Sequence, residues 1–434
     1  MTIWIKGGEV VDPVRGTVEK SDILVERGRI VQIMPPGSLK EGGGDLRIID
    51  ASKKIVVPGL IDMHVHLREP GHEYKETIAT GAKAGVVGGF TGLACMPNTY
   101  PVNDSRSVTE FILRQAAKAK LLRVYPVAAV TKGQMGASLT EFGDLRAAGA
   151  VAVSDDGLPV LDSELMRRAL EYASYHGLAV VSHCEDLTLS EGGDMHEGCI
   201  STRIGLRGIP AASEEIMVFR DISLARLTGC PVHIAHVSTA GSVDLIKRAK
   251  EDGVPVTAET APHYFSLDHR AVVGYDTHAK MKPPLRTPED VLAIKKALKE
   301  DIIDVIATDH APHSPLEKEV EFDKAAFGII GLETAVSLTL ALVREGVVDL
   351  PQAFRKMSHD PAKILNLPSV RLEAGGRADL AIIDPEREWV LRADDMHSKS
   401  RNSPFIGRTL RGKNELTMIG GKVVWKATAK HSRR

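Results

Sequence analysis

The chain has 434 residues, of which 43% are hydrophobic and 26% are charged, and its formal net charge is −2. This composition can bury a large core and excludes a disordered polyelectrolyte. The balanced charge offers no basis for a nucleic-acid or membrane partner. We therefore expect a protein that acts on a small molecule.

The cysteines and the first residues bear on the cellular compartment. Cys95, Cys184, Cys199 and Cys230 are far apart and show no metal-binding or redox spacing, which predicts reduced thiols. The N-terminus lacks the charged and apolar segments of a secretory signal, and no apolar run reaches membrane-spanning length. These features predict a cytoplasmic protein.

The two ends of the chain have a similar sequence pattern. Residues 1–54 contain short apolar runs separated by Gly and Pro, and similar runs return at 378–384 and 418–425. We expect one small β-sandwich built from residues 1–54 and 367–428, followed by a polar, basic tail at 429–434.

Residues 55–366 alternate short apolar runs with helical patterns. Eight such runs are the number required by a closed parallel barrel, so the predicted fold class is α/β, a (β/α)8 TIM-type barrel. The eight runs are Leu60–His66, Thr91–Met96, Arg123–Val130, Ala150–Ser154, Ala179–His183, Val232–His236, Val254–Ala258 and Asp304–Ala307.

The stretch from Val56 to Gly71 is the starting point for locating a functional site. It reads as one buried strand that ends in His64 and His66, and residues two apart in a strand point to the same face. Two imidazoles are therefore expected side by side at the carboxyl end of the strand, which is where barrels carry their chemistry.

Polar residues also follow the later runs. They are Asn98, Asp155, Asp156, His183, His236 and Asp309. A single buried histidine is more often a core residue, and an aspartate in Ser154–Gly157 suits a turn. Their joint occurrence at strand ends that meet at one mouth favours a site for two divalent metals, most simply Zn²⁺.

Six motifs extend this interpretation. Asp62–Gly71, Met96–Thr99, Ser154–Gly157, Ser182–Glu185, Ala235–Ser238 and Ala307–His313 resemble, in this order, those of the bacterial dihydroorotases in the amidohydrolase superfamily. The resemblance implies that His64, His66 and Asp309 hold one zinc and His183 and His236 the other. It also implies that Asp156 bridges them, because its spacing to His183 matches the family better than that of Asp155.

The resemblance further implies substrate contacts. Arg68, Asn98 and His313 match positions that bind the substrate carboxylate, and Phe327–Gly328 matches a loop that contacts the ring. Arg68 suits a carboxylate through a two-pronged contact, although a surface salt bridge is its plainer alternative. Lys282 stands where the family has a substrate-binding asparagine. We expect the long segment from Asp309 to Leu332 to be a substrate-binding loop or a lid.

The implied function is a zinc-dependent cyclic amidohydrolase that interconverts N-carbamoyl-L-aspartate and L-dihydroorotate in de novo pyrimidine (UMP) biosynthesis. Zinc lowers the pKa of water to about 7 and so provides hydroxide, and Asp309 serves as general base and then general acid. A homodimer is expected, and association with aspartate transcarbamoylase is known for some members of the family.

Two alternatives remain. Hydantoinase, dihydropyrimidinase and allantoinase share the barrel but bridge their metals with a carboxylated lysine, and this chain has no lysine in 150–160. The other alternative is an inactive dihydroorotase-like partner of aspartate transcarbamoylase, although such a protein loses ligand histidines and this chain retains them.

Overall fold

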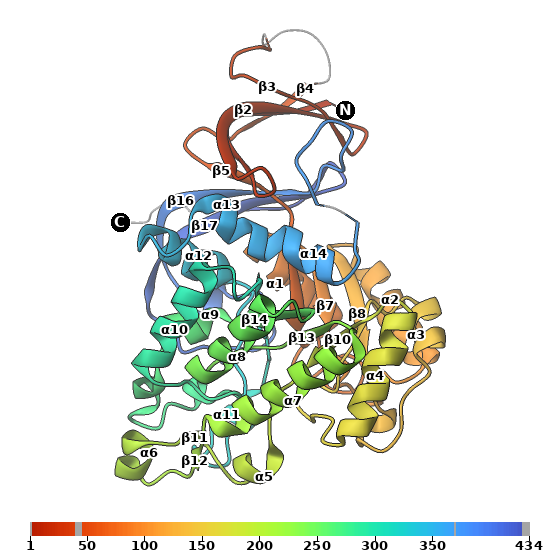
Figure 1. Cartoon of the computed structure of the whole chain (residues 1–434). Helices are drawn as coiled ribbons and strands as arrows, with labels where there is room; N and C mark the ends of the chain where they lie inside the picture. The colour runs from red at the N-terminus through yellow and green to blue at the C-terminus, as the bar shows by residue number, and fades with distance from the viewer. Residues whose placement is uncertain (1, 40–45, 369, 428–434) are drawn as a thin grey trace.

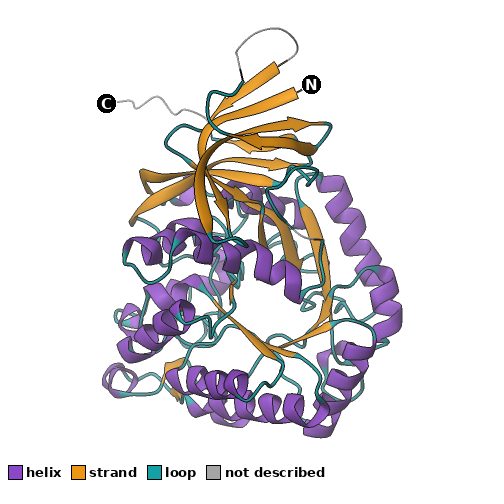
Figure 2. Ribbon diagram, turned by 45° about the horizontal axis from the view of Figure 1, so that its top comes forward, coloured by secondary structure: helices purple, strands orange, loops and turns teal. Residues whose placement is uncertain are grey.

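The computed structural model describes residues 2–39, 46–368 and 370–427. A β/α barrel forms the larger part, and a sheet made from both chain ends lies against it, as the red and blue strands at the top of Figure 1. Figure 2 shows helices arranged around the barrel strands. The predicted barrel with a β domain from both ends is thus confirmed, while the predicted tail at 429–434 lies outside the described residues.

Within the described residues, the barrel sheet has eight strands in sequence order and all of its pairings are parallel. Each strand lies within or beside one of the eight runs predicted from the sequence. The strands are β6 (Leu60–Val65), β7 (Phe90–Cys95), β8 (Arg123–Ala128), β9 (Ala152–Val153), β10 (Ala179–Ser182), β13 (Val232–Ile234), β14 (Val256–Thr260) and β15 (Val305–Ile306).

The first and last strands close the barrel through the segment that follows β15. Val65 forms a parallel bridge with His310, and the backbone N–H of His66 donates to the His310 carbonyl at 2.8 Å. The buried carboxylate of Asp62 accepts from the backbone N–H groups of His64 and Thr308, each at 3.1 Å. Asp62 therefore ties the two edges together directly below the site.

Helices cover the outside of the barrel. The larger ones are α1 (Ile78–Gly88), α2 (Arg106–Ala119), α3 (Phe142–Ala148), α4 (Ser163–Tyr175), α7 (Ala212–Thr228), α8 (Ala240–Glu251), α10 (Pro288–Lys299) and α12 (Ala335–Arg344). Shorter helical turns are η1 (Lys132–Gln134), α5 (Leu187–Ser190), α6 (Cys199–Ile204), α9 (Pro262–Ser266), η2 (His269–Val272), η3 (Thr277–Ala279), α11 (Pro315–Lys318) and η5 (Ala393–Asp395).

The helix ends follow local chemistry. Helix α1 begins at Ile78, because the Thr77 side chain accepts from the backbone N–H of Thr80 and acts as the N-cap. The helix ends at Gly89, whose φ of 97° a residue with a Cβ adopts only at a cost. Residues next to the helix therefore set both of its ends.

The amino-terminal end of the barrel is covered by a helical segment that lies between it and the terminal sheet (Figure 1). This segment comprises α13 (Leu350–Phe354), the π-helical turn η4 (Arg355–His359) and α14 (Asp360–Ile364). Leu365 joins the apolar cluster of the barrel interior, with Met63, Val181 and Ala235. The barrel interior is consequently packed, and the side chains at the carboxyl ends of its strands converge on the mouth.

The terminal sheet contains strands from both chain ends. They are β1 (Thr2–Asp12), β2 (Thr17–Glu26), β3 (Arg29–Met34), β4 (Leu46–Asp50), β5 (Ile55–Pro58), β16 (Leu380–Val390), β17 (Thr409–Ile419) and β18 (Lys422–Lys426). They form one continuous sheet in which β5 joins the N-terminal to the C-terminal strands. Isoleucines, valines and leucines from both ends pack in a shared core.

The interpretation of Val56–His66 as one strand is wrong. The chain divides at Gly59: β5 pairs with β1 and β16 in the terminal sheet, whereas β6 belongs to the barrel. Gly59 donates to the carbonyl of Asp379 at 2.9 Å, and a Cβ at this position would lie 2.3 Å from Thr91 Oγ1. A continuous apolar run cannot reveal this change of sheet, because both strands are buried.

The segment between β10 and α7 was not assigned from the sequence. It contains α5, α6 and a small parallel pair formed by β11 (Met195–His196) and β12 (Gly208–Ile209). No helix among the described residues combines the length and apolar character needed to cross a bilayer.

The bond network of Asp62 gives a test of barrel closure. Asp62→Ala leaves two buried backbone donors unpaired, so we expect the free energy of unfolding of the metal-free protein to fall by about 2–4 kcal/mol. Asp62→Asn keeps one acceptor oxygen and is the matched control. Denaturant titration measures both variants, and equal stability of the alanine, asparagine and parent proteins would contradict this role.

Candidate active site

Four histidines and one carboxylate meet at the carboxyl end of the barrel. Asp156, in the turn after β9, lies 3.3 Å from Nε2 of His64, 3.4 Å from Nε2 of His66 and 3.4 Å from Nδ1 of His183. Nε2 of His236 is 3.5 Å from the same carboxylate. All five side chains are buried, so the structure brings together residues that the sequence only placed at separate strand ends.

The donor atoms form two groups that share Asp156. Its oxygens cluster with the ring nitrogens of His64 and His66 on one side and those of His183 and His236 on the other, with all atoms of a group within 4.8 Å of one another. Nε2 of His64 is buried and has no hydrogen-bond partner. Imidazole nitrogens and carboxylate oxygens at this spacing fit divalent cations such as Zn²⁺.

Two more aspartates were considered from the sequence. Asp309 Oδ1 lies 3.1 Å from His66 Nε2 and 3.6 Å from His64 Nε2, at the edge of the first group. Asp155 points away from the histidines, because its carboxylate accepts from the backbone N–H groups of Val130 and Thr131, at 2.8 and 3.1 Å. Of the two neighbouring aspartates, Asp156 is therefore the one among the histidines.

Three polar side chains hold the far nitrogens of the histidines. His64 Nδ1 lies 2.5 Å from Glu259 Oε1, and His66 Nδ1 lies 2.8 Å from Asn98 Oδ1. His183 Nε2 lies 2.8 Å from Glu185 Oε2. Such contacts fix the tautomer and orientation of a metal-binding imidazole, so each of these residues orients a candidate ligand.

Glu185 and Glu259 were missed by the sequence reasoning. Glu185 lies two residues after His183, on the same strand end, and Glu259 is a single acidic residue inside the apolar strand β14. A charge within a buried strand is a usable signal, because a buried carboxylate needs partners. Its partner could not be named without the tertiary structure.

The electrostatics of the cluster favour ionised carboxylates. Burial alone would raise the pKa of Asp156, but the surrounding His64, His183 and His236 hold it well below its usual range. Burial alone would lower the pKa of His183, but hydrogen bonds and charge interactions with Asp156 and Glu185 raise it to about 9. These shifts favour an ionised Asp156 next to a protonated His183.

Three residues at the mouth have left-handed backbone conformations, which side chains with a Cβ rarely adopt. The φ angles are 62° at Arg68, 33° at His236 and 48° at Asp309. Such strain persists only where the surroundings enforce it, and it concentrates at functional sites. All three lie just after strands β6, β13 and β15, where the chain turns into the mouth.

Arg68 and His313, both predicted to contact substrate, lie together. Arg68 Nη2 is 3.4 Å from His313 Nε2, and Arg68 Nε donates to the carbonyl of Pro312 at 3.2 Å. Burial and the adjacent Arg68 lower the pKa of His313 to about 2, so this imidazole is neutral. Its backbone N–H donates to Asn402 Oδ1 at 3.1 Å, a residue that the sequence reasoning did not single out.

The other predicted substrate contacts occupy different surroundings. Lys282 Nζ lies 2.6 Å from Glu185 Oε1 and 5.3 Å from the centre of the Phe327 ring. Gly328 donates its N–H to the carbonyl of Lys280, while Asn402 and the buried Lys318 donate to its own carbonyl. The predicted substrate loop is thus held by side chains beneath it, and it borders a cavity of about 700 Å³ next to Lys282 and Phe327.

Known proteins were compared with the chain. A family model described as dihydro-orotase-like matches residues 53–242. A dihydroorotase from Geobacter metallireducens is 54% identical over 426 residues, which cover 98% of this chain and 100% of that protein. A dihydroorotase from Syntrophus aciditrophicus is 52% identical and covers 98% of this chain and 99% of its own length.

The chain belongs to the dihydroorotase family. Among solved structures, an L-hydantoinase (dihydropyrimidinase) from Arthrobacter aurescens superposes with a TM-score of 0.87 at 25% identity, covering 98% of this chain and 96% of that one. The resemblance read from the six motifs is confirmed. As a member of this family, the protein is an enzyme that hydrolyses cyclic amide bonds.

The contact of Lys282 with Glu185 gives a test within this dihydroorotase-family site. Lys282→Asn leaves the buried Glu185 with His183 as its partner, so we expect the group of His183 and His236 to bind an added divalent cation such as Zn²⁺ up to about 10-fold less tightly. Chelator competition measures the affinity. Lys54→Asn, which breaks a lysine–glutamate pair of 2.5 Å in the terminal sheet, is the control. Equal zinc affinity in both variants would contradict the contact's importance.

Proposed function

We propose that this enzyme is a zinc-dependent dihydroorotase that interconverts N-carbamoyl-L-aspartate and L-dihydroorotate in pyrimidine biosynthesis. The observation that carries the proposal is Asp156, which lies within 3.5 Å of ring nitrogens of four buried histidines. The dihydroorotases that share half of its residues over their whole length support the same substrate.

The proposed ligands of one zinc are His64, His66 and Asp309, and those of the other are His183 and His236, with Asp156 between them. Two zinc ions held there would polarise the amide carbonyl and make water acidic enough to be a nucleophile near pH 7. Glu259, Asn98 and Glu185 keep the imidazoles in the orientation that this requires.

Asp309 is proposed as the general base and acid. Its carboxylate lies beside His66 at the mouth, and its pKa is lowered by His64 and His66 although burial opposes this. In ring opening it accepts the proton of the attacking water and delivers it to the amide nitrogen as the C–N bond breaks. In ring closure the same proton travels in reverse.

Substrate recognition is assigned to the residues around the mouth. The Arg68 guanidinium and the neutral His313 form a donor pair for the substrate carboxylate, and Asn98 adds an amide next to His66. Lys282 and Phe327, which lie 5.3 Å apart from Nζ to ring centre, and Gly328, which lies next to His313, are assigned to contact the substrate ring. An acidic substrate fits this arrangement better than a neutral hydantoin, because Arg68 is a buried cation.

The assembly and location of the enzyme belong to the same proposal. We infer a cytoplasmic homodimer, with association with aspartate transcarbamoylase as a further property to examine. Analytical ultracentrifugation of the protein alone, and then mixed with that enzyme, measures both states.

The proposal is tested by ring opening of L-dihydroorotate on zinc-replete enzyme, with hydantoin and allantoin assayed in parallel and zinc counted in the same sample. We expect turnover of dihydroorotate alone, loss of turnover on chelation and recovery on addition of zinc. Turnover of a neutral ring would contradict the role of Arg68. Bound zinc without turnover of any ring would favour the inactive partner subunit.

Asp309→Asn tests the proton-transfer role. Because an amide cannot accept the proton, we expect kcat to fall by about 10²–10⁴-fold. The zinc content of the variant is measured alongside, since Asp309 is also a proposed ligand. Asp252→Asn alters an exposed aspartate paired with Arg226 and serves as the control. Retention of kcat in Asp309→Asn would assign the base to another group.

Arg68→Lys tests carboxylate recognition. A lysine keeps the charge but loses the planar fork, so we expect KM for dihydroorotate to rise about 10–100-fold with a smaller change in kcat. Steady-state kinetics measures both constants, with the exposed Arg226→Lys as the matched substitution. An unchanged KM in Arg68→Lys would mean that Arg68 does not contact the substrate.

A further inference from the structure

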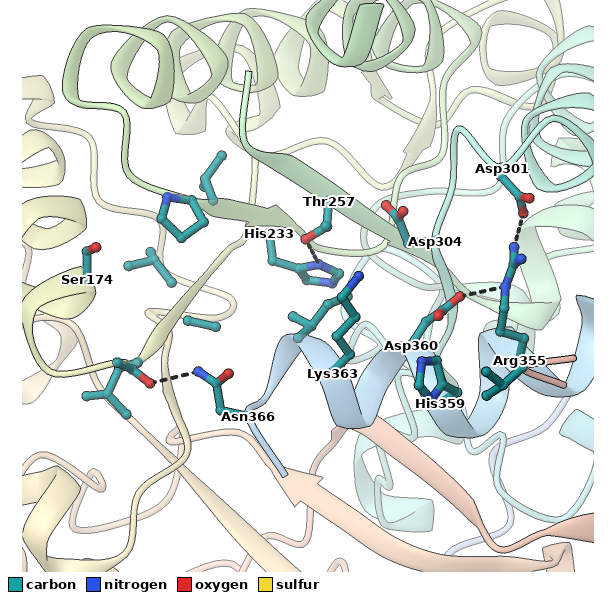
Figure 3. Close-up of a pocket in the computed structure, with 18 residues that line it drawn as sticks. Ser174, His233, Thr257, Asp301, Asp304, Arg355, His359, Asp360, Lys363 and Asn366 are labelled. Carbon is teal, nitrogen blue, oxygen red and sulfur yellow. Dashed lines mark hydrogen bonds and ion pairs between the residues drawn. The ribbon is translucent and has the colours of Figure 1, made fainter. Parts of the chain in front are cut away.

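A second large cavity lies at the opposite end of the barrel from the active site. This floor cavity has a volume of about 650 Å³ and is lined by the amino-terminal ends of β10, β13 and β14 and by α14, including Ala179, Val232, His233, Thr257 and Lys363. Figure 3 shows His233 beside Thr257 in its wall, with Lys363 from α14 nearby. None of the proposed metal ligands lines this cavity.

A chain of buried polar side chains leads from the floor cavity to the metal centre. His233 Nδ1 lies 2.8 Å from Thr257 Oγ1, and His233 Nε2 lies 3.3 Å from Glu259 Oε2. The other oxygen of the same carboxylate, Oε1, lies 2.5 Å from His64 Nδ1. His233 and Glu259 are each 1% exposed, so this chain of hydrogen bonds lies inside the protein.

The surroundings make this chain unusual. Met63, Val181, Ala235 and Ala307 belong to an apolar cluster in the barrel interior. Two polar side chains in such a core destabilise the fold unless all of their polar atoms form hydrogen bonds. When all of these hydrogen bonds form, they hold the two side chains in one geometry. His233 therefore needs an explanation beyond packing.

The hydrogen-bond partners dictate one arrangement of protons. Because a metal at His64 Nε2 requires the proton on Nδ1, His64 donates to Glu259 Oε1. His233 then donates a hydrogen bond from Nε2 to Glu259 Oε2. Its Nδ1 accepts a hydrogen bond from the Thr257 hydroxyl group. With both oxygens held, the Glu259 carboxylate cannot rotate away from His64.

We propose that His233 is a positioning residue of the metal centre, which acts through Glu259 on His64 from the floor of the barrel. The inference rests on the metal-dependent function proposed above. Loss of the Nε2–H donor would free one Glu259 oxygen, loosen the orientation of His64 and weaken the cation site that His64 and His66 form with Asp156.

A pair of amide substitutions tests the proposal. In His233→Gln the side-chain amide reaches the position of Nε2 and can donate to Glu259, whereas in His233→Asn the shorter amide reaches only the Thr257 side. Zinc affinity of the metal-free variants is measured by chelator competition. We expect one of the two zinc equivalents to bind about 10–100-fold more weakly in His233→Asn, and to stay within a few-fold of the parent in His233→Gln.

Lys363→Ala is the control, since it alters the same cavity without touching the chain of hydrogen bonds. Equal zinc affinity in His233→Asn and the parent would overturn the proposal. An equal loss of zinc affinity in the asparagine and glutamine variants would also overturn it, because that result would indicate a general disruption of the barrel floor. Zinc affinity is measured without substrate. Failure of this proposal is therefore distinguishable from failure of the dihydroorotase assignment, which the ring-opening assay decides.

Discussion

The structure depends on one buried carboxylate among imidazoles. Asp156 is 5% exposed, and ring nitrogens of four histidines lie within 3.5 Å of it. Removing this many polar groups from water is costly unless they are paired. The barrel achieves the pairing because parallel strands end at one mouth, where side chains from β6, β9, β10 and β13 converge. A bound cation would complete it.

The cluster is supported from beneath as well as from the side. Glu259, Asn98 and Glu185 each take the far nitrogen of one histidine, and two of them have partners of their own in His233 and Lys282. The active site is therefore the upper end of polar networks that extend into the barrel core and out to the loop carrying Lys282. The geometry of the mouth therefore depends also on Glu259, Glu185 and His233, which are not among the proposed substrate contacts.

The terminal sheet supports the barrel at its other end. Strand β5 continues directly into β6 at Gly59, and Gly59 and Arg123 both bond Asp379 at the start of the C-terminal strands. The helical segment α13–α14 fills the space between sheet and barrel (Figure 1). The terminal sheet and the barrel thus share a boundary of buried backbone. The amino-terminal end of the barrel has a structural role, and the candidate active site lies at the carboxyl end.

The sequence by itself determined the order of strands and helices, the positions of His64, His66, His183 and His236 at strand ends, and the family. These follow from local periodicity and from short motifs, which act over a few residues. Only the tertiary structure decided that the run from Val56 divides between two sheets and that Asp156 faces inward while Asp155 bonds the backbone. It also decided that Glu259 contacts His64 and that His233 contacts Glu259, because these partners lie 195 and 26 residues apart in sequence. Contacts between distant segments arise from packing, and no local pattern encodes them.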